Sequence, residues 1–366
     1  MTGLICLKGD YLEGGGQLVR TALALSALTG IPFEVNDIRK GRKDPGLKAQ
    51  HLHCIEALKK LCNAEVVGLG LGSTYLKFVP GIIEPKTVST DIGTAGSVSL
   101  FLQAMLLPAI LSGGKVRLKV KGGTSTKWAM PYDFFKEVLL PQMSRYADID
   151  ATIITRGYYP KGGGQIDLKI KSRYSFADFS GAPRLVLVER GRLVAIKGLS
   201  NASSDLSKAQ VAERQAHAAK QVLTKLNVPV SIVTQYSDTS SMGSDIVLWA
   251  IFSRRADEVD MANPIILGAD DLGEQGKRAE IVGETAAKKL LCEIESGAVV
   301  DAHTADNLIP FIALFGGEIK TSEITDHTKT NAYVVEQFLG VKLEFDDAKK
   351  IIQCNGYVKQ DLSEEK

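Results

Sequence analysis

The chain has 366 residues, of which 45% are hydrophobic and 23% are charged, and its formal net charge is +2. This composition is typical of a globular protein with a substantial core, and it argues against a protein that coats duplex nucleic acid, which would be far more basic. The five cysteines are scattered and form no C-x-x-C pair. They predict neither a disulfide framework nor a zinc site, and they favour a reducing, cytoplasmic location.

We expect no membrane segment, because the most apolar stretch, residues 98–111, is shorter than the about 20 residues that span a bilayer. A different pattern recurs along the chain, in which an amphipathic helix runs through Gly or Asn into an alternating β-branched strand. Its copies are residues 21–28 and 31–35, 222–226 and 228–233, and 334–339 and 341–345. This pattern predicts an α/β (α+β) fold built from repeated small βα modules.

The order of predicted strands and helices changes near Ala182. Beyond it, residues 185–188, 193–196, 230–235, 246–252 and 265–269 are predicted to be strands, and residues 207–226 a helix. We interpret residues 184–276 as an inserted α/β domain. Residues 1–183 and 277–366 would then form the catalytic core, which resumes with a helix over 278–296.

A glycine cluster, Gly14-Gly15-Gly16, lies between a predicted strand at residues 4–7 and a helix that begins near Gln17. A strand, glycine loop and helix in this order direct backbone N–H groups at a phosphate, although the same residues also suit a plain tight turn. Glu13 beside the loop could hold Mg²⁺, and Arg20 lies one turn into the helix.

A second cluster of small residues, 91–97, leads into the apolar helix predicted over 98–111 and again suits an anion. Gln103 is the polar side chain well inside that helix. Because a buried Gln needs hydrogen-bond partners, it either contacts a purine edge or bonds to neighbouring backbone.

Residues 39–48 form a basic loop with five basic residues and one acid. Arg39 and Arg42 on this loop, flanked by Gln50 and His51, could grip a terminal phosphate, since guanidinium groups bind phosphate in bidentate fashion. The alternative is a solvated charged loop.

The chain has five histidines: His51, His53, His217, His303 and His327. We expect His217 on the polar face of a helix, His53 in a helix without an evident partner, and His51 beside the basic loop. His303 and His327 each precede an apolar helical run, so each would stand near the positive end of a helix, where the neutral imidazole that a nucleophile requires is favoured. The residues alone leave both open, along with a purely structural role.

Taken together, these residues resemble the RNA 3′-terminal phosphate cyclases over nearly the whole chain. The resemblance is carried in order by Glu13 to Gln17 with Arg20, Ile38-Arg39, Gly41-Arg42, Pro45 to Leu47 with Gln50-His51, Gly93 to Ser97 with Gln103, Gly122 to Thr124, Pro131, Gly157 to Pro160 with Gly162 to Gly164, Ala305-Asp306, and His327 with Thr330-Asn331. It implies repeated βα units similar to the enolpyruvate transferases, with a smaller domain inserted before the last unit.

The resemblance also implies the chemistry. His327 would be the nucleophile that carries AMP, and Arg20, Arg39, Arg42, Gln50 and His51 would hold the RNA phosphates. ATP would be held by Gln103, Pro131, His303, Thr304, Ala305, Asp306 and Asn307, and Mg²⁺ or Mn²⁺ by Glu13 and Asp306. The chain departs from the family at His303, often aromatic, at Asn307, often Gln, and around Trp128.

The expected reaction is ATP-dependent closure of an RNA 3′-terminal phosphate to a 2′,3′-cyclic phosphate, through histidine–AMP and RNA–AMP intermediates. The expected partners are an RNA 3′-end and ATP, without a membrane, and an oligomer is left open. One alternative is a non-catalytic RNA-binding or ribosome-assembly factor of the same fold. The other is an enolpyruvate transferase, which would not consume ATP and rests on fold analogy alone.

Overall fold

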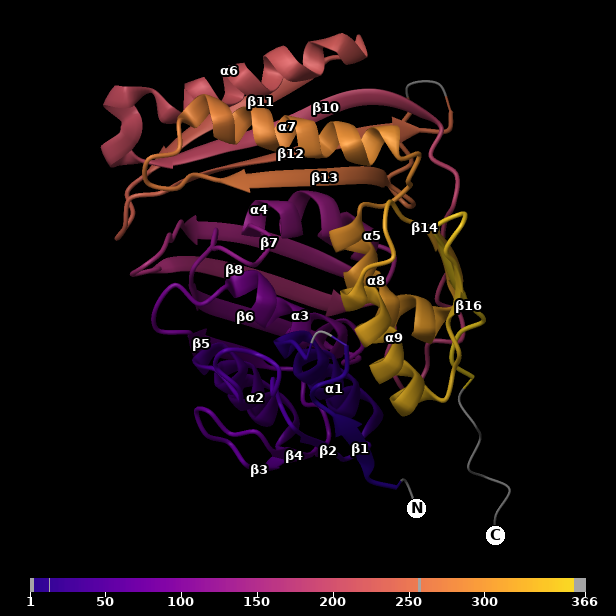
Figure 1. Ribbon diagram of the computed structural model, residues 1–366. Coiled ribbons are helices and arrows are strands. Elements are labelled where there is room, and N and C mark those ends of the chain that lie inside the picture. The colour runs from indigo at the N-terminus through magenta and orange to yellow at the C-terminus, as the bar shows by residue number, and fades with distance from the viewer. Residues whose placement is uncertain (1–2, 13, 256–257, 359–366) are drawn as a thin grey trace.

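The computed structural model describes residues 3–12, 14–255 and 258–358 (Figure 1). Within these ranges the chain forms four four-stranded sheets that mix parallel and antiparallel pairs, with helices packed beside them. This confirms the α/β fold with repeated small modules. No helix in the described part of the chain is both long and apolar enough to cross a membrane.

The first module has the strand order β1-β2-β4-β3, with one parallel pair, β1 and β2, and two antiparallel pairs. Its elements are β1 Ile5–Lys8, α1 Gly16–Thr29, β2 Phe33–Asn36, α2 Ala49–Cys62, β3 Glu65–Val67 and β4 Leu76–Val79. The helix α1 ends as predicted at Gly30, whose left-handed conformation (φ 74°) lets its N–H donate to the Ser26 carbonyl.

The second module repeats this arrangement with the order β5-β6-β8-β7. It consists of β5 Thr87–Asp91, α3 Val98–Ile110, β6 Lys115–Gly122, α4 Tyr132–Phe134, a π-helical turn Phe135–Leu139, α5 Leu140–Met143, β7 Ala147–Thr155 and β8 Gly164–Ser172. The apolar helix α3 is buried at nearly every position, which confirms the prediction of a core helix.

The third module has the same order again, β9-β14-β16-β15, but a long segment separates its first strand from the rest. Its elements are β9 Leu185–Leu187, α8 Ala302–Phe315, β14 Gly317–Lys320, α9 Asp326–Leu339, β15 Glu344–Asp346 and β16 Ile351–Cys354. The expected strand at 185–188 therefore joins β14 of the third module. Gly317 permits the approach, since a Cβ there would lie 2.1 Å from the Leu185 carbonyl oxygen.

The remaining sheet, β11-β10-β12-β13, has a different order and forms the upper layer in Figure 1. Its elements are β10 Arg192–Ser203, a 3₁₀ turn Ser204–Ala209, α6 Val211–Leu223, a 3₁₀ turn Thr224–Leu226, β11 Val230–Ser237, β12 Ser244–Ser253, β13 Ile265–Leu272 and α7 Ala279–Glu295. The helices α6 and α7 lie side by side over it. The segment thus enters after the first strand of the third module, and α7, expected in the core, packs on this sheet. The domain limits themselves stay a prediction.

Candidate active site

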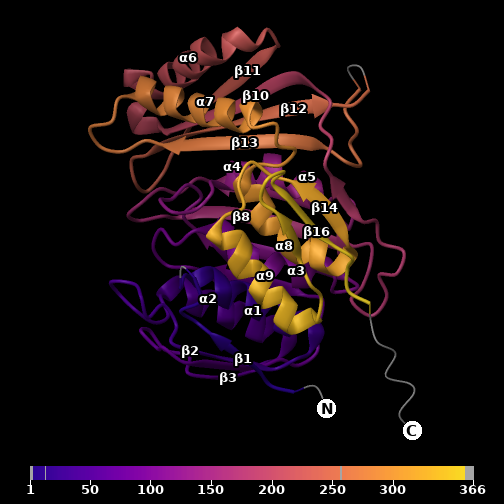
Figure 2. The same cartoon turned by 45° about the vertical axis from the view of Figure 1, so that its right-hand side comes forward.

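A cleft of about 810 Å³ opens where the starts of α1, α8 and α9, the basic loop and the end of β13 meet. Figure 2 shows α8 and α9 between the β13 layer and α1. The cleft brings together ten of the predicted site residues, which come from all three modules: Arg20, Arg39, Arg42, Gln50, His51, Gln103, His303, Asp306, Asn307 and His327.

His327 lies at the first turn of α9 and lines the cleft. The N-cap of this helix is Thr325, whose hydroxyl accepts the Thr328 N–H at 3.0 Å, while the Thr328 hydroxyl accepts the Thr325 N–H at 3.3 Å. This reciprocal capping box fixes the start of the helix and so the position of His327 within its first turn.

Asp306 on α8 holds this helix start in place. Its Oδ1 accepts hydrogen bonds from the hydroxyls of Thr325, at 2.7 Å, and Thr328, at 2.5 Å. Burial raises the pKa of Asp306, and the two hydroxyl hydrogen bonds act in the opposite direction by favouring the carboxylate. The Asp306 side chain is nearly inaccessible to solvent, and its hydrogen bonds join α8 to the beginning of α9.

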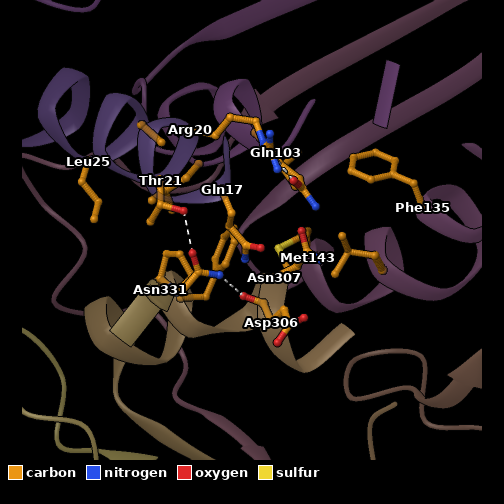
Figure 3. A pocket seen from close by; sticks show the side chains of 16 residues that line it. Gln17, Arg20, Thr21, Leu25, Gln103, Phe135, Met143, Asp306, Asn307 and Asn331 are labelled. Carbon is orange, nitrogen blue, oxygen red and sulfur yellow. Dashed lines mark hydrogen bonds between the residues drawn. The ribbon is translucent and has the colours of Figure 1, made fainter. Parts of the chain in front are cut away.

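A second set of hydrogen bonds ties α9 to α1. Asn331 donates to the Asp306 backbone carbonyl at 2.7 Å, and its side-chain oxygen accepts the Thr21 hydroxyl at 2.7 Å. Both bonds are the dashed lines in Figure 3. Helices from the first and third modules are thereby locked together directly below the cleft.

The small pocket in Figure 3, about 40 Å³, adjoins the cleft and shares Gln17, Arg20, Gln103, Asp306 and Asn307 with it. Here the Arg20 Nε donates to the Gln103 side-chain oxygen at 3.2 Å. The partner of Gln103 is therefore a side chain rather than neighbouring backbone. Burial lowers the pKa of Arg20 to about 10, so its guanidinium group stays charged at neutral pH.

His51 is a buried, neutral imidazole. Its Nδ1 accepts the Lys48 N–H at 2.9 Å, which places the ring proton on Nε2. Burial and the charges of Arg20 and Arg39 lower its pKa to about 3. The ring packs on the first glycine loop so closely that a Cβ on Gly16 would lie 2.0 Å from Nε2.

The basic loop presents Arg39 and Arg42 to the cleft. Arg39 has a left-handed backbone (φ 56°), and its buried Nε has no hydrogen-bond partner, which is costly for a charged donor. Burial, followed by the charge of Arg42, lowers the pKa of Arg39. The loop thus sets two guanidinium groups on one wall of the cleft, where they favour an anionic ligand.

The second glycine cluster does not line the cleft. Gly123 donates to the Gly96 carbonyl at 2.8 Å, and its own carbonyl accepts the Val98 N–H at 3.0 Å. The first N–H group of α3 is therefore already satisfied by the loop after β6. These residues pack two loops of the second module together instead of binding an anion there.

Four predicted residues stand outside this group. Glu13 lies outside the described residues. Thr304 and Ala305 are buried inside α8, where the Thr304 hydroxyl donates to Asp301 at 2.8 Å, and Pro131 sits at the start of α4. In the described part of the chain, no three His, Cys, Asp or Glu side chains form a metal-holding group.

The sequence reasoning missed the upper wall of the cleft. Asp270, Asp271, Lys277 and Lys289 line it. Asp271 pairs with Lys277 and with Lys289, the latter at 3.0 Å, and burial raises the pKa of Asp270 to about 6. The predicted strand at 265–269 ended before the two aspartates, but β13 runs on to Leu272 and carries both of them to the cleft.

Known proteins match the chain over nearly its whole length. The family model described as RNA 3′-terminal phosphate cyclase matches residues 11–345. A protein of that name from Pyrococcus abyssi is 43% identical over 344 residues, covering 94% of this chain and 95% of the relative. Those from Archaeoglobus fulgidus and Saccharolobus solfataricus are 41% and 42% identical, covering 96% and 93% of this chain and 100% and 96% of each relative.

Proposed function

The chain belongs to the RNA 3′-terminal phosphate cyclase family, and from this premise we propose that it converts an RNA 3′-terminal phosphate to a 2′,3′-cyclic phosphate at the expense of ATP. The observation that carries the proposal is the convergence of His327, Asp306 and the cationic groups Arg20, Arg39 and Arg42 on one cleft. These residues are far apart in the sequence, and only the fold brings them together.

The reaction needs activation because a terminal phosphate would have to expel hydroxide to close onto the 2′-hydroxyl. In the first step, a ring nitrogen of His327 attacks the α-phosphorus of ATP, and the bond to pyrophosphate breaks. The imidazole loses its proton, leaving a histidine–AMP phosphoramidate. Covalent catalysis of this kind replaces one difficult displacement by easier ones.

In the second step, a 3′-phosphate oxygen of the RNA attacks the same phosphorus, the P–N bond breaks, and an RNA–AMP anhydride forms. The 2′-hydroxyl then attacks the RNA phosphorus, AMP leaves, and the hydroxyl proton is released. In each displacement the departing group is a better leaving group than hydroxide. Positioning and charge stabilisation carry most of the catalysis in such phosphoryl transfers.

The RNA phosphates have matching donors in the cleft. The guanidinium groups of Arg39 and of the exposed Arg42 are suited to the terminal phosphate, and the Nε2–H of the neutral His51 ring adds an uncharged donor. Gln50, which donates to the Ser97 carbonyl at 3.4 Å, lines the same wall. Because these groups contact phosphate rather than base edges, they select an RNA end without selecting its sequence.

ATP is proposed to lie on the α8 side, against His303, Asp306, Asn307 and Gln103. Asp306 offers the hard oxygen donor that Mg²⁺ or Mn²⁺ prefers, and such an ion would neutralise the triphosphate when bound. For the fold, the three modules with one shared strand order support the proposed likeness to the enolpyruvate-transferase architecture.

The test is to incubate the protein with α-labelled ATP and Mg²⁺, denature it, and measure acid-labile label on the protein. His327→Ala should abolish the label, whereas His303→Ala, a histidine on the same cleft wall, should retain it. Label that persists in His327→Ala would move the nucleophile to His303. No label in the folded parent with several divalent ions would favour the non-catalytic RNA-binding factor.

A further inference from the structure

A second cavity, about 870 Å³, lies beside the cleft at the seam between the second module and the β13 layer. The two hollows have five wall residues in common, Thr126, Lys127, Leu272, Glu274 and Lys277. Lys127 from the second module and Glu274 from the loop after β13 form an exposed ion pair at 3.3 Å between them. A chain leaving the cleft along this seam would therefore enter the second cavity.

The turn between β7 and β8 presents an aromatic side chain to this cavity. Tyr159 is 76% exposed, although its neighbour Tyr158 is buried with its hydroxyl bonded to Asp245 at 3.0 Å. Lys161 N–H donates to the Ser241 hydroxyl at 3.0 Å, which ties the same turn to the loop before β12. Both loops lie at the same end of the sheets, on the left in Figure 1. The exposed ring is thus held on a fixed turn.

A second exposed aromatic side chain stands on the cleft side of the seam. Trp128 is 88% exposed, has a left-handed backbone (φ 70°), and lines the cleft. The Lys127 ammonium lies 5.4 Å from its ring centroid. A tryptophan this exposed contributes little to packing, and its ring is accessible to a ligand in the cleft.

Four cationic side chains, Lys127, Lys277, Arg214 and Arg278, line the second cavity, and Glu274 is the carboxylate among its described wall residues. Three of the four pair with carboxylates: Lys127 with Glu274, Lys277 with Asp271 and Arg214 with Glu280. Arg278 is 71% exposed and lies 3.6 Å from Glu280. Cationic side chains interleaved with exposed aromatic rings are what single-stranded nucleic acid requires, because the bases stack on the rings while the phosphates meet the cations.

We propose that the second cavity binds the unpaired nucleotides that precede the RNA 3′-phosphate, with Tyr159 in the cavity and Trp128 on the cleft side of the seam as stacking surfaces. This rests on the proposed function, since the end of the RNA is then fixed in the cleft. It assigns the inserted layer a role, which is to supply one wall of the RNA path through the loop from Gly273 to Arg278. Unpaired RNA fits better than a duplex, whose bases are not free to stack on protein rings.

The test compares 3′-phosphorylated oligonucleotides of three and ten nucleotides with the same 3′-terminal sequence. The parent enzyme should have a lower KM for the decamer. Tyr159→Ala should raise the KM for the decamer by roughly five- to a hundredfold, as expected for losing one stacked base, and leave that for the trimer nearly unchanged. Arg278→Ala should act in the same direction and weaken the salt dependence. Lys349→Ala, which removes an exposed cation (73%) on the β15–β16 side, should change neither KM.

Annealing a complement to the upstream seven nucleotides of the decamer should remove its advantage over the trimer. Equal KM values for the trimer and the decamer in the parent, or an equal effect of Tyr159→Ala at both lengths, would overturn the RNA path. Self-adenylation with ATP alone separates the two proposals. If the parent carries label and cyclises the trimer, the proposed function holds whatever the length series shows.

Discussion

Replacing Gly16 by alanine should damage the cleft through a steric conflict that the structure defines. The added Cβ would lie 2.0 Å from the Nε2 of His51, about 1.4 Å inside ordinary contact distance. The ring cannot retreat freely, because its Nδ1 accepts the Lys48 N–H at 2.9 Å and the side chain is buried. The clash must therefore move either the first turn of α1 or the start of α2.

Overpacking of this kind costs about 1–3 kcal/mol, and loss of the His51 hydrogen bond adds about 0.5–1.5 kcal/mol. Alanine in a helix gains at most about 1 kcal/mol over glycine, which offsets part of the loss. We expect Gly16→Ala to lower the free energy of unfolding by about 1–3 kcal/mol, measured by urea denaturation. The cyclisation rate should fall by more than the loss of folded protein explains, because Arg20 and His51 both move.

Gly41→Ala is the matched control, since Gly41 lies in the basic loop, has an ordinary φ, and has open space where the Cβ would go. It should leave both stability and activity within about 0.5 kcal/mol of the parent. The double variant Gly16→Ala/His51→Ala should recover part of the stability, because the conflicting ring is gone. The reasoning fails if Gly16→Ala is as stable as Gly41→Ala, or if removing the His51 ring brings no recovery.

Two further predictions concern the same elements. The pKa of His51 is about 3 in the folded protein, against an ordinary value of 6.5. Between these two pH values the ring binds a proton in the unfolded chain but not in the folded one. His51 therefore makes the protein less stable as the pH falls through this window. Between pH 7 and pH 5 the parent should lose about 2 kcal/mol more unfolding free energy than His51→Gln, and equal losses would contradict this. Thr328→Val, which removes a hydroxyl donor from Asp306, should cost about 1.5–3 kcal/mol and slow self-adenylation. Lys329→Ala, on the exposed face of the same helix, should change neither, and a normal adenylation rate in Thr328→Val would refute the positioning role.

The sequence predicted those features of the fold that depend on local chemistry. The glycine at position 30 predicted the end of α1, and the predominantly apolar run of residues 98–111 predicted the buried helix α3. The same reasoning placed the candidate site residues after the first glycine loop, on the basic loop, in the apolar helix and before two C-terminal helical runs. It could not show that these segments meet, because their convergence depends on how the modules pack.

What the sequence could not predict is decided by long-range contacts. Residues 185–188 have the alternation of a strand, but this pattern does not reveal that the strand pairs with β14, more than 100 residues later. Likewise, the second glycine cluster looks like an anion site because small residues precede a helix. In the structure the Gly123 carbonyl accepts the Val98 N–H, and no local sequence pattern predicts this partner.

The spacing of Thr328 and Asn331, which follow His327 on α9, has a physical explanation that bears on the choice between an enzyme and a binding factor. Thr328 and Asn331 are three residues apart on α9, so they share the helix face that bonds to Asp306 and, through Asn331, to Thr21. His327 lies on the adjacent face and lines the cleft. Asn331 therefore ties the third module to the first, and Thr328 fixes the start of α9 within the third module, whether or not the protein reacts with ATP. A non-catalytic relative would need both residues equally. Only His327 distinguishes the two functions, so His327→Ala should leave the fold intact and remove the label from the protein.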